Sequence, residues 1–464
     1  MRKLKHIHFV GIAGIGMSGI AKALLELGYQ VSGSDLNSSH LTRKLRKMGA
    51  AVHQGHRQNN VGSPELMVVS SAVSPQNPEV AYARKKGIPV IQRAEMLAML
   101  MEGKKGIAVA GTHGKTTTTS MIALVLEKNN LDPSVVIGGE LNDIGGNAKL
   151  GRGEHLVVEA DESDGSLLKL SPTIAVVTNI EADHLDYHHT LERIILAFKK
   201  FIGNLPNSGL AVLCKDCPNL EKIISLSNKR LITYGIEREA DLVAKEIKLS
   251  GLSSTFLVFL KGERLGEVKL NVPGRHNVSN ALAAISVGLE VGLNFPQISQ
   301  VLTTFKGVKR RFQIKGNVEG IMVIDDYAHH PTEIETTLSA AKSGFNRRTI
   351  SVFQPHRYTR TRDLLEEFGG SFHQADKVVI TDIYPALEEP IPGVDARQIA
   401  ELIKKREKGK EVRFISSKSE IVTHLLSTAR RGDLILTLGA GDVWKVSRDF
   451  VSQLKKQRTE ASGK

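Results

Sequence analysis

The chain has 464 residues, too many for one ordinary hydrophobic core, and we expect three domains. Hydrophobic residues make up 41% of it, as in folded domains, and no stretch is apolar enough to span a membrane. The formal net charge of +13 is dispersed and mixed with acids, apart from short basic clusters at 404–410 and 455–458, which favours small polyanionic ligands over nucleic acid.

The first hundred residues alternate short apolar runs with helical stretches, which is typical of parallel βαβ units and predicts a Rossmann-like domain. The N-terminus superficially imitates a signal peptide, but four glycines between positions 11 and 19 disfavour an export helix and indicate a turn after a strand ending at Val10. The two cysteines, Cys214 and Cys217, are too few for a disulfide framework or a complete zinc site. We therefore expect a reduced, cytoplasmic protein, either a monomer or a homodimer.

The glycine loop that follows Val10 carries a GxGxxG pattern at Gly14, Gly16 and Gly19. Asp35 closes the next predicted strand, at the distance typical of a ribose-binding acid. By itself the pattern suits NAD or any other nucleotide diphosphate, and it is also compatible with a turn that only packs a helix on a strand.

The segment 106–119, GIAVAGTHGKTTTT, predicts a second phosphate site, where a buried strand over Ile107–Ala110 turns into a helix beginning near Lys115. Lys115 would reach the β and γ phosphates of a nucleotide, and the Thr116 hydroxyl would hold Mg²⁺. Val109 stands where the Walker pattern has its first glycine, so an ordinary turn with an exposed lysine is the alternative.

Acidic segments follow the next two predicted strands of the central region. Glu159 opens an acidic run at 159–164, at a strand end where a Mg²⁺ ligand is expected, whereas a solvated turn explains at least some of the other acids. His184, within TNIEADHLDY, could bind a metal ion or stabilise charge on a transferring phosphoryl group. We expect His188 and His189 to be surface residues.

The remaining pattern completes an α/β protein. Residues 240–272 alternate as in an antiparallel sheet, a helix from Asn280 to Val291 follows, and a basic loop at 305–312 precedes a third series of strands and helices. The predicted domains are a Rossmann-like domain at 1–103, a central domain with a phosphate loop and a mainly parallel sheet at 104–309, and a second Rossmann-like domain at 310–464.

A series of short motifs carries a resemblance that spans nearly the whole chain. In chain order they are GIAGIGMS, AGTHGKTTT, VVEADESD, TNIEADHLDY, GRHNVSN, RRF, DDYAHHPTE, FQPHRYTRT and LGAGD. This set resembles the Mur ligases, and the residues around Glu162, Tyr327 and Arg357 resemble the alanine-adding branch rather than the tripeptide-adding one. The resemblance implies an N-terminal domain for the UDP-sugar, a central P-loop ATPase domain and a C-terminal domain for the amino acid.

The resemblance also assigns residues to each site, with ATP and Mg²⁺ as cofactors. For the UDP-sugar it implies Gly11, Gly14, Gly16, Met17, Ser18, Asp35, Ser70 and Ser71. For ATP it implies Gly111, Thr112, His113, Gly114, Lys115, Thr116, Thr117, His276, Asn277, Asn280, Arg311, Asp325, Asp326 and Tyr327. For the amino acid it implies His329, Arg357 and Arg360, because an arginine fork matches both oxygens of an α-carboxylate. The metal residues are Thr116, Glu159 and His184, and the catalytic set is Lys115, Glu159, His184, Arg311 and His329.

Two of these positions have plainer interpretations. Asn277 could instead cap a helix N-terminus. Several sister ligases carry a carbamylated lysine where this chain has Phe198, with Lys199 adjacent, so we expect no carbamylation.

The implied reaction transfers a phosphoryl group from ATP to the lactyl carboxylate of UDP-N-acetylmuramic acid, and the L-alanine amine then attacks the acyl phosphate. Such chemistry mainly demands positioning and charge neutralisation. Water must be excluded, so we expect the third domain to close over the second, and His329 is a candidate base for the amine.

Two other classes of function share part of the pattern. An NAD-dependent dehydrogenase would explain the first glycine loop and Asp35 but leave Lys115 and Thr116 without a role. A nucleotide-sugar sensor would explain both loops but not Glu159, His184 and Arg360 together.

Overall fold

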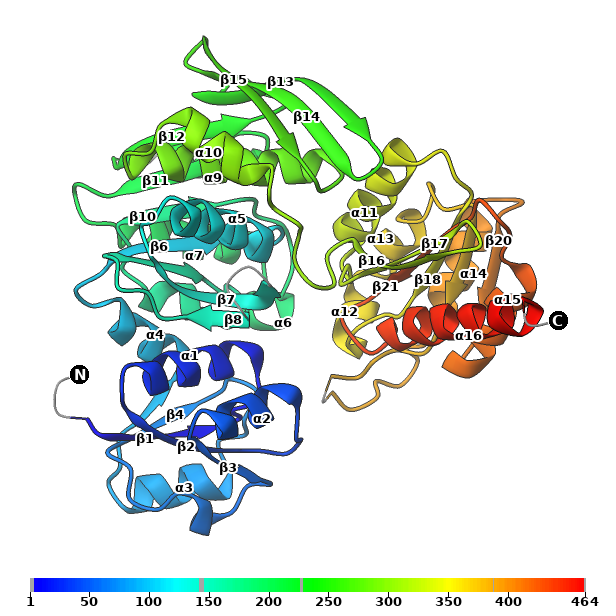
Figure 1. The fold of residues 1–464 in the computed structure, drawn as a ribbon. Coiled ribbons are helices and arrows are strands. Elements are labelled where there is room, and N and C mark those ends of the chain that lie inside the picture. Colours follow the sequence, from blue (N-terminus) through cyan, green and yellow to red (C-terminus); the bar gives the residue numbers. More distant parts are fainter. Residues whose placement is uncertain (1–3, 142–145, 226–227, 387, 463–464) are drawn as a thin grey trace. The chain divides into compact units, whose positions relative to one another are not determined.

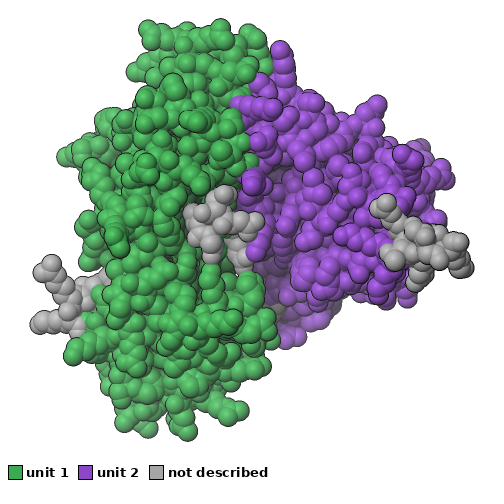
Figure 2. Space-filling view, viewed as in Figure 1, with its two compact units in different colours: residues 1–246, 256–268, 278–305 green, residues 247–255, 269–277, 306–464 purple. Residues whose placement is uncertain are grey.

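The computed structural model describes residues 4–141, 146–225, 228–386 and 388–462. The chain divides into two compact units, one of residues 1–246, 256–268 and 278–305 and one of residues 247–255, 269–277 and 306–464 (Figure 2). Among the described residues, no helix is both long and apolar enough to cross a lipid bilayer.

The N-terminal sheet of the first unit has five strands in the order β3-β2-β1-β4-β5, and every neighbouring pair is parallel. Its elements are β1 (His6–Val10), α1 (Ile15–Glu26), β2 (Gln30–Asp35), α2 (His40–Lys47), β3 (Ala51–Gln54), η1 (Gln58–Asn60), β4 (Leu66–Val69), α3 (Pro78–Lys85), β5 (Val90–Gln92) and α4 (Arg93–Met101). The Rossmann-like prediction for this part of the chain is therefore confirmed. The carboxyl ends of β1 and β2 lie side by side, which brings the glycine loop next to Asp35.

The central sheet has ten strands in the order β15-β14-β13-β12-β11-β10-β6-β9-β7-β8. Its elements are β6 (Lys105–Ala110), α5 (Lys115–Lys128), β7 (Ser134–Leu141), β8 (Gly146–Lys149), β9 (His155–Glu159), η3 (Ser166–Lys169), β10 (Ile174–Val177), α6 (Leu185–His188), α7 (Leu191–Gly203), β11 (Leu210–Cys214), α8 (Pro218–Ile224), β12 (Arg230–Gly235), β13 (Leu242–Ser250), β14 (Ser253–Leu260), β15 (Glu263–Leu270), α9 (Arg275–Glu290) and α10 (Phe295–Leu302). Strands β6 and β9 to β13 pair in parallel, and β8 runs antiparallel to β7.

Two-residue turns link β13 to β14 and β14 to β15, and a connection this short reverses the chain, as the predicted antiparallel segment requires. One boundary differs from the prediction. Helix α9 begins at Arg275 and not at Asn280, so Asn277 lies inside the first turn and cannot be the N-cap residue. Its side-chain amide donates to the Pro273 carbonyl at 2.7 Å.

Helix α1 connects the two sheets of the first unit. It starts at the glycine loop, lies on the N-terminal sheet and also packs against β7 and β8 (Figure 1). Asn147 of β8 donates to the Ser18 hydroxyl at 3.1 Å, and a Cβ added at Gly19 would lie 3.2 Å from that same Asn147 amide nitrogen. The close approach of β8 thus explains the last glycine of the GxGxxG pattern.

The second unit contains a six-stranded sheet in the order β16-β17-β21-β18-β19-β20, parallel except for β16 at its edge. Its elements are β16 (Gln313–Val318), β17 (Ile321–Asp326), α11 (Pro331–Gly344), β18 (Thr349–Phe353), α12 (Tyr358–Asp363), α13 (Leu365–Gly370), β19 (Lys377–Ile380), α14 (Arg397–Arg406), β20 (Glu411–Phe414), α15 (Lys418–Thr428), β21 (Leu434–Leu438) and α16 (Trp444–Ser462). Successive residues of β17 enter opposite cores, Ile324 with α11 and α14 and Val323 with α15 and α16. Helices therefore cover both faces, as predicted for an α/β domain.

A buried carboxylate organises the carboxyl edge of the N-terminal sheet. Glu79, in the first turn of α3, is fully buried and accepts four hydrogen bonds: from His8 Nε2 (3.1 Å), Ser34 Oγ (2.5 Å), the Arg57 backbone N–H (2.9 Å) and Asn60 Nδ2 (2.7 Å). Burial alone would raise the pKa of Glu79, but these donors outweigh it and the pKa lies below its ordinary value.

We expect Glu79→Ala to lower the free energy of unfolding of this part of the protein by about 3 kcal/mol, because four donors lose their acceptor, two of them the fully buried side chains of His8 and Ser34. Chemical denaturation followed by circular dichroism measures the change. Glu65→Ala, which removes an exposed carboxylate bonded to the N–H groups of Lys5 and His6, is the matched control and should unfold close to wild type. Equal behaviour of the two variants would contradict the role given to Glu79.

Candidate active site

The turn from β6 into α5 is fixed by the neighbouring strand end. Thr112 N–H donates to the Asn179 carbonyl at 3.1 Å, His113 N–H donates to Asn179 Oδ1 at 2.8 Å, and the Thr178 hydroxyl donates to the His113 carbonyl at 2.5 Å. Gly111 has φ +135°, and a Cβ there would lie 2.0 Å from Thr178 Oγ1, so only glycine fits. Gly114, φ +80°, precedes α5, whose first turn contains no acidic residue, and the helix can offer its N–H groups to an anion.

Lys115, the first residue of α5, lies among carboxylates. Its ammonium is 2.8 Å from Glu162 Oε1. Burial disfavours the charged lysine, but Glu162, Asp161 and Glu159 outweigh burial and raise the pKa of Lys115 above its ordinary value. The alternative of an exposed lysine on a plain turn is wrong, because the Lys115 side chain is only 14% exposed.

Two of the three predicted metal residues are in contact. Thr116 Oγ1 lies 2.9 and 3.1 Å from the two carboxylate oxygens of Glu159, which also accepts the Gly138 backbone N–H at 2.8 Å. His184 precedes α6 in the left-handed region, with φ 52°, and its Nε2 is 3.6 Å from Asp183 Oδ2. A left-handed conformation is uncommon for residues other than glycine, although histidine adopts it more often than most.

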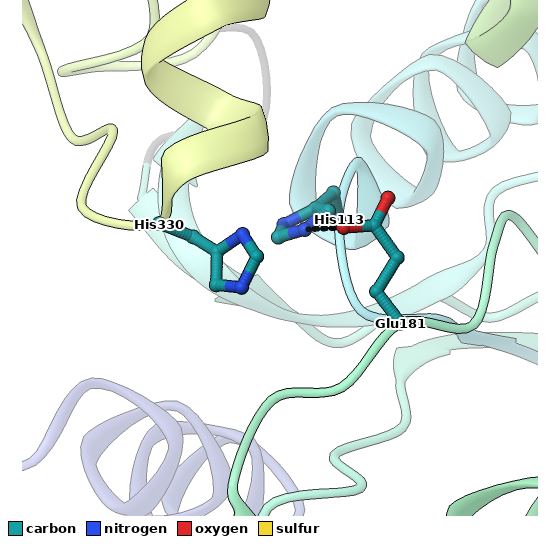
Figure 3. A group of neighbouring side chains, drawn as sticks. All are labelled: His113, Glu181 and His330. Atoms are coloured by element: carbon teal, nitrogen blue, oxygen red, sulfur yellow. Dashed lines mark hydrogen bonds and ion pairs between the residues drawn. The ribbon is translucent and has the colours of Figure 1, made fainter. Parts of the chain in front are cut away.

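The phosphate loop also carries an imidazole that pairs with the segment after β10. His113 Nε2 lies 3.3 Å from Glu181 Oε2, and Figure 3 draws this pair with a dashed line. The Glu181 backbone N–H donates to the Thr112 hydroxyl at 2.9 Å, which ties the same two segments again. Figure 3 also labels His330, a residue of the other unit, whose Nδ1 accepts the Thr332 N–H and caps α11.

Asn280, predicted to contact adenine, lies against the phosphate loop. Its Oδ1 accepts the Thr118 hydroxyl at 3.1 Å, and a Cβ at Gly114 would lie 2.7 Å from the same oxygen. His276, in the first turn of α9, has its pKa lowered to about 4 by burial, with a smaller contribution from Arg311. The neutral imidazole is therefore the form present at physiological pH.

The N-terminal glycine loop is held by β2. The N–H groups of Gly11 and Ile12 donate to the Ser34 carbonyl at 2.9 and 3.0 Å, and Ala13 N–H donates to Asp35 Oδ2 at 2.9 Å. A Cβ at Gly11 would lie 3.0 Å from Ser70 Cβ, so the structure brings Gly11, Asp35 and Ser70 together.

Other residues predicted for the nucleotide-sugar site differ in their exposure. Ser71 is exposed, whereas the side chains of Met17 and Ser18 are buried against the protein, at 1% and 2% exposure. The Ser18 hydroxyl donates to the Ile15 carbonyl and accepts a hydrogen bond from the Asn147 amide. The exposed part of the loop is therefore the backbone around Gly14, at the start of α1.

In the second unit, the basic turn before β16 is bound to the strand ends. Arg310 pairs with the buried Asp325 at 3.1 Å and donates to the Gly439 carbonyl at 2.6 Å. Asp326 accepts the backbone N–H groups of Phe312 (2.6 Å) and Ala328 (2.7 Å), and burial raises its pKa even though Arg311 opposes the shift. In this structure both carboxylates stabilise the turn.

Arg311, the arginine expected to reach ATP, is more open than Arg310. Its guanidinium carbon lies 5.2 Å from the centre of the Tyr327 ring, and its Nη1 lies 3.5 Å from Glu333 Oε1. Arg310 stacks on the same ring at 4.9 Å. The same Tyr327 ring contacts the His329 ring edge-on at 5.4 Å.

The three predicted amino-acid residues surround an imidazole that the sequence did not single out. The His356 ring contacts the His329 ring edge-on at 5.8 Å and stacks on Tyr384 at 5.6 Å, and its Nδ1 accepts a hydrogen bond from Arg360 Nη1 at 3.5 Å. Arg357, with φ +71°, lies 4.0 Å from Glu388 Oε1. Burial lowers the pKa of His356 to about 2, and His329 and the nearby arginines add to the shift.

Models of the Mur ligases match the chain in three successive segments: "Mur ligase family, catalytic domain" at residues 6–105, "Mur ligase middle domain" at 109–288 and "Mur ligase, glutamate ligase domain" at 310–441. A protein of Geotalea daltonii named UDP-N-acetylmuramate--L-alanine ligase is 55% identical over 453 residues, which cover 98% of this chain and 99% of that protein. The chain belongs to the Mur ligase family. The resemblance predicted from the motifs is confirmed.

Further relatives of this Mur ligase are consistent with the family assignment. A protein of the same name from Pelotomaculum thermopropionicum is 52% identical and covers 99% of each chain. The crystal structure of UDP-N-acetylmuramate-alanine ligase MurC from Thermotoga maritima has a TM-score of 0.84 at 33% identity, covering 98% of this chain and 100% of that one. A murein peptide ligase from Psychrobacter arcticus has a TM-score of 0.71 at 26% identity, covering 97% and 98%.

One expectation about this Mur ligase is wrong. His188, predicted at the surface, is buried, and its Nε2 hydrogen-bonds to the Glu162 carbonyl at 2.7 Å. The short helix α6 turns this imidazole inward under the acidic segment. Glu162 itself is not part of a solvated turn, because its side chain is only 4% exposed.

Predictions from the sequence also concern the two cysteines and the pair Phe198 and Lys199. Cys214 and Cys217 are free and buried, and burial raises the pKa of Cys214 to about 11, which keeps it a thiol. Phe198, at the position of the sister enzymes' modified lysine, is fully buried in α7, and Lys199 is exposed.

We expect His356 to make this Mur ligase less stable in acid. Native His356 stays neutral down to about pH 2, whereas the unfolded chain binds a proton below about pH 6.5, so stability falls as the pH drops through this window. At pH 5 the loss amounts to about 2 kcal/mol. Unfolding curves at pH 7.5 and 5.0 should show a smaller acid loss for His356→Gln than for wild type. His373→Gln, at an exposed site of the same unit, controls for the substitution, and an unchanged acid loss in His356→Gln would refute the expectation.

Proposed function

We propose that this protein is an ATP-dependent amide-forming ligase that joins L-alanine to the lactyl carboxylate of UDP-N-acetylmuramic acid, in the synthesis of a peptidoglycan precursor. The observation that carries the proposal is the end-to-end similarity to proteins named UDP-N-acetylmuramate--L-alanine ligase, at 52 to 55% identity over 97 to 99% of this chain. The phosphate loop around Lys115 supplies residue types that this reaction needs. So does the cluster formed by His329, His356, Arg357 and Arg360.

Each reactant has a place in the proposal. The nucleotide sugar would bind at the Gly11–Gly16 loop, whose backbone is exposed around Gly14. ATP would bind at the turn between β6 and α5, where α5 offers its N–H groups and Lys115 its charge. The alanine carboxylate would bind to Arg357 and Arg360, because the two donors of one guanidinium match its two oxygens.

The residues at the phosphate loop fit a magnesium ion. Thr116 and Glu159 bring a hydroxyl and a carboxylate into contact, and Mg²⁺ prefers such oxygen ligands. A bound Mg²⁺ would neutralise phosphate charge. We further propose that the protein acts in the cytoplasm, where ATP is abundant and its two thiols stay reduced.

The proposed chemistry has two displacements. A lactyl carboxylate oxygen bonds to the γ-phosphorus of ATP as the bond to ADP breaks, and the alanine nitrogen then bonds to the carboxyl carbon as phosphate leaves with the former carboxylate oxygen. Lys115 stabilises the transferring phosphoryl group, while His329 can accept a proton from the amine. His329 Nδ1 lies 3.2 Å from Glu333 Oε2, and this contact orients the imidazole.

Incubation with UDP-N-acetylmuramic acid, ATP, Mg²⁺ and single amino acids, followed by measurement of phosphate, tests the proposal. We expect phosphate release to require both the nucleotide sugar and an amino acid, with L-alanine preferred. Release without the sugar would contradict the substrate assignment, and NADH binding without any release would favour a dehydrogenase.

Lys115→Ala should reduce alanine-dependent ADP release by at least about 100-fold, because the transferring phosphoryl group loses its main protein cation. Binding of the UDP-sugar, measured by calorimetry, should stay close to wild type. Lys128→Ala, at the exposed far end of α5, is the control. Loss of UDP-sugar binding in folded Lys115→Ala would refute the assignment of separate sites.

Arg357→Ala should raise the KM for alanine by about 10- to 100-fold, the effect of losing one charge-assisted hydrogen bond to a carboxylate, and leave the KM for ATP nearly unchanged. Steady-state kinetics with each substrate varied in turn measure both constants. Arg362→Ala removes an arginine of helix α12, which begins directly after Arg357. Arg362 is 54% exposed and paired with Asp363, so this variant serves as the control. Equal increases in both constants would exclude this role for Arg357.

A further inference from the structure

The ammonium of Lys115 is fully used inside the protein. It donates to the Gly111 carbonyl at 2.5 Å, to the Thr112 carbonyl at 3.2 Å and to Glu162 Oε1 at 2.8 Å. A lysine ammonium has three N–H donors, so every donor already has an acceptor. The side chain is folded back over its own loop, and a phosphate can bind Lys115 only by displacing one of these acceptors.

Glu162, one of the three hydrogen-bond acceptors of Lys115, lies in a turn that is fixed by hydrogen bonds. Its backbone carbonyl accepts hydrogen bonds from His188 Nε2 at 2.7 Å and from Gly165 N–H at 3.1 Å, which fix the turn after β9. Its side chain is 4% exposed, and its second oxygen, Oε2, is buried with no hydrogen-bond partner among the described residues. Burial raises the pKa of Glu162 to about 7; Lys115 opposes this shift, while the nearby Asp161 adds to it. The Lys115 ammonium is therefore the group that favours the ionised carboxylate at this buried position.

The carboxylate is the acceptor that a phosphate would displace. The two loop carbonyls are neutral and can share the lysine with an anion, whereas a phosphate oxygen and Glu162 Oε1 carry like charges and repel each other at the same ammonium. Asp161, next in the chain, adds to the negative charge facing Lys115. Burial disfavours its ionisation, yet Lys115 and Arg93 lower its pKa below the ordinary value.

We infer that Glu162 is a positioning residue whose carboxylate holds the Lys115 ammonium over the phosphate loop when no nucleotide is bound and is exchanged for nucleotide phosphate on binding. This inference rests on the proposed function, in which the loop binds ATP. The ion pair compensates both buried charges in the absence of nucleotide, and it competes with the nucleotide. Glu162 therefore weakens nucleotide binding, favours release of the product ADP and returns the lysine to a fixed position after each turnover.

Glu162→Gln tests the inference, because the amide keeps the shape and a hydrogen bond but not the charge. We expect calorimetry with ADP and Mg²⁺ to give a Kd about tenfold lower than for wild type, the effect of removing one charged competitor. Dissociation of a fluorescent ADP analogue should slow, and kcat should fall while the KM for ATP also falls. A residue with a merely structural role would not lower Kd and kcat together.

A double-substitution cycle with Lys115→Ala separates competition for the lysine from general charge repulsion. Without Lys115, the buried Glu162 has no cation beside it and takes up a proton, so a further change to glutamine should alter the ADP Kd by less than about twofold. A tenfold gain that persists without Lys115 would overturn the inference.

Glu154→Gln is the matched control, because it removes the same charge at the opposite, exposed end of β9, where Glu154 pairs with Lys105. Its ADP affinity should equal that of wild type. If Glu162→Gln does not fold, Glu162→Asp, which withdraws the carboxylate by one methylene, should change the Kd in the same direction but less. Wild-type protein that binds no ADP would refute the ATP site itself, whereas wild-type binding with an unchanged or higher Kd in the Glu162 variants would refute only the inference.

Discussion

The hydrogen bonds between the β6–α5 turn and the end of β10 are the constraint on which the candidate active site depends. Thr178 and Asn179 bind both sides of the loop backbone, and the missing side chain at Gly111 lets the two segments approach. The loop is therefore shaped before any ligand arrives, because protein groups satisfy its backbone. What stays available is the start of α5, whose first turn contains no acidic residue of its own.

Each of the three sheets has a buried carboxylate near the carboxyl ends of its strands, and each carboxylate is compensated differently. Glu79 collects neutral donors, Asp325 pairs with Arg310, and Glu162 pairs with Lys115. The partners of the first two are contacted by no proposed ligand. The partner of the third is the lysine that a nucleotide would need, so only this ion pair competes with a proposed ligand.

The local motifs predicted the strands, the turn residues and the contact between Thr116 and Glu159, because these features follow from short-range spacing and from parallel strands ending at one edge. Burial within a motif could not be predicted in the same way. Glu162 stands in a run of acids that reads as a solvated turn, and His188 contacts a carbonyl 26 residues away, so only the packed chain identifies either one.

The residues around His356 in the second unit differ in how far the sequence could have predicted them. His356 lies inside the motif FQPHRYTRT and could have been selected as a titratable group directly before the predicted Arg357. Tyr384 and Glu388 follow β19 in a segment without a local pattern, and their contacts with His356 and Arg357 depend on the order of strands in the sheet. The start of α9 at Arg275 was missed because Gly274 and the polar residues after it read as a loop.

Helix α1 belongs to two sheets at once, since its first turn closes the nucleotide-sugar loop while its side packs on β7 and β8. A fragment cut after the N-terminal sheet would expose the packed side of this helix, and a central fragment would lose the cover of β8. The two segments are consequently poor candidates for independent exchange between proteins by recombination, even though separate family models recognise them. Two anionic substrates bound to these loops would be carried by one compact unit of the chain.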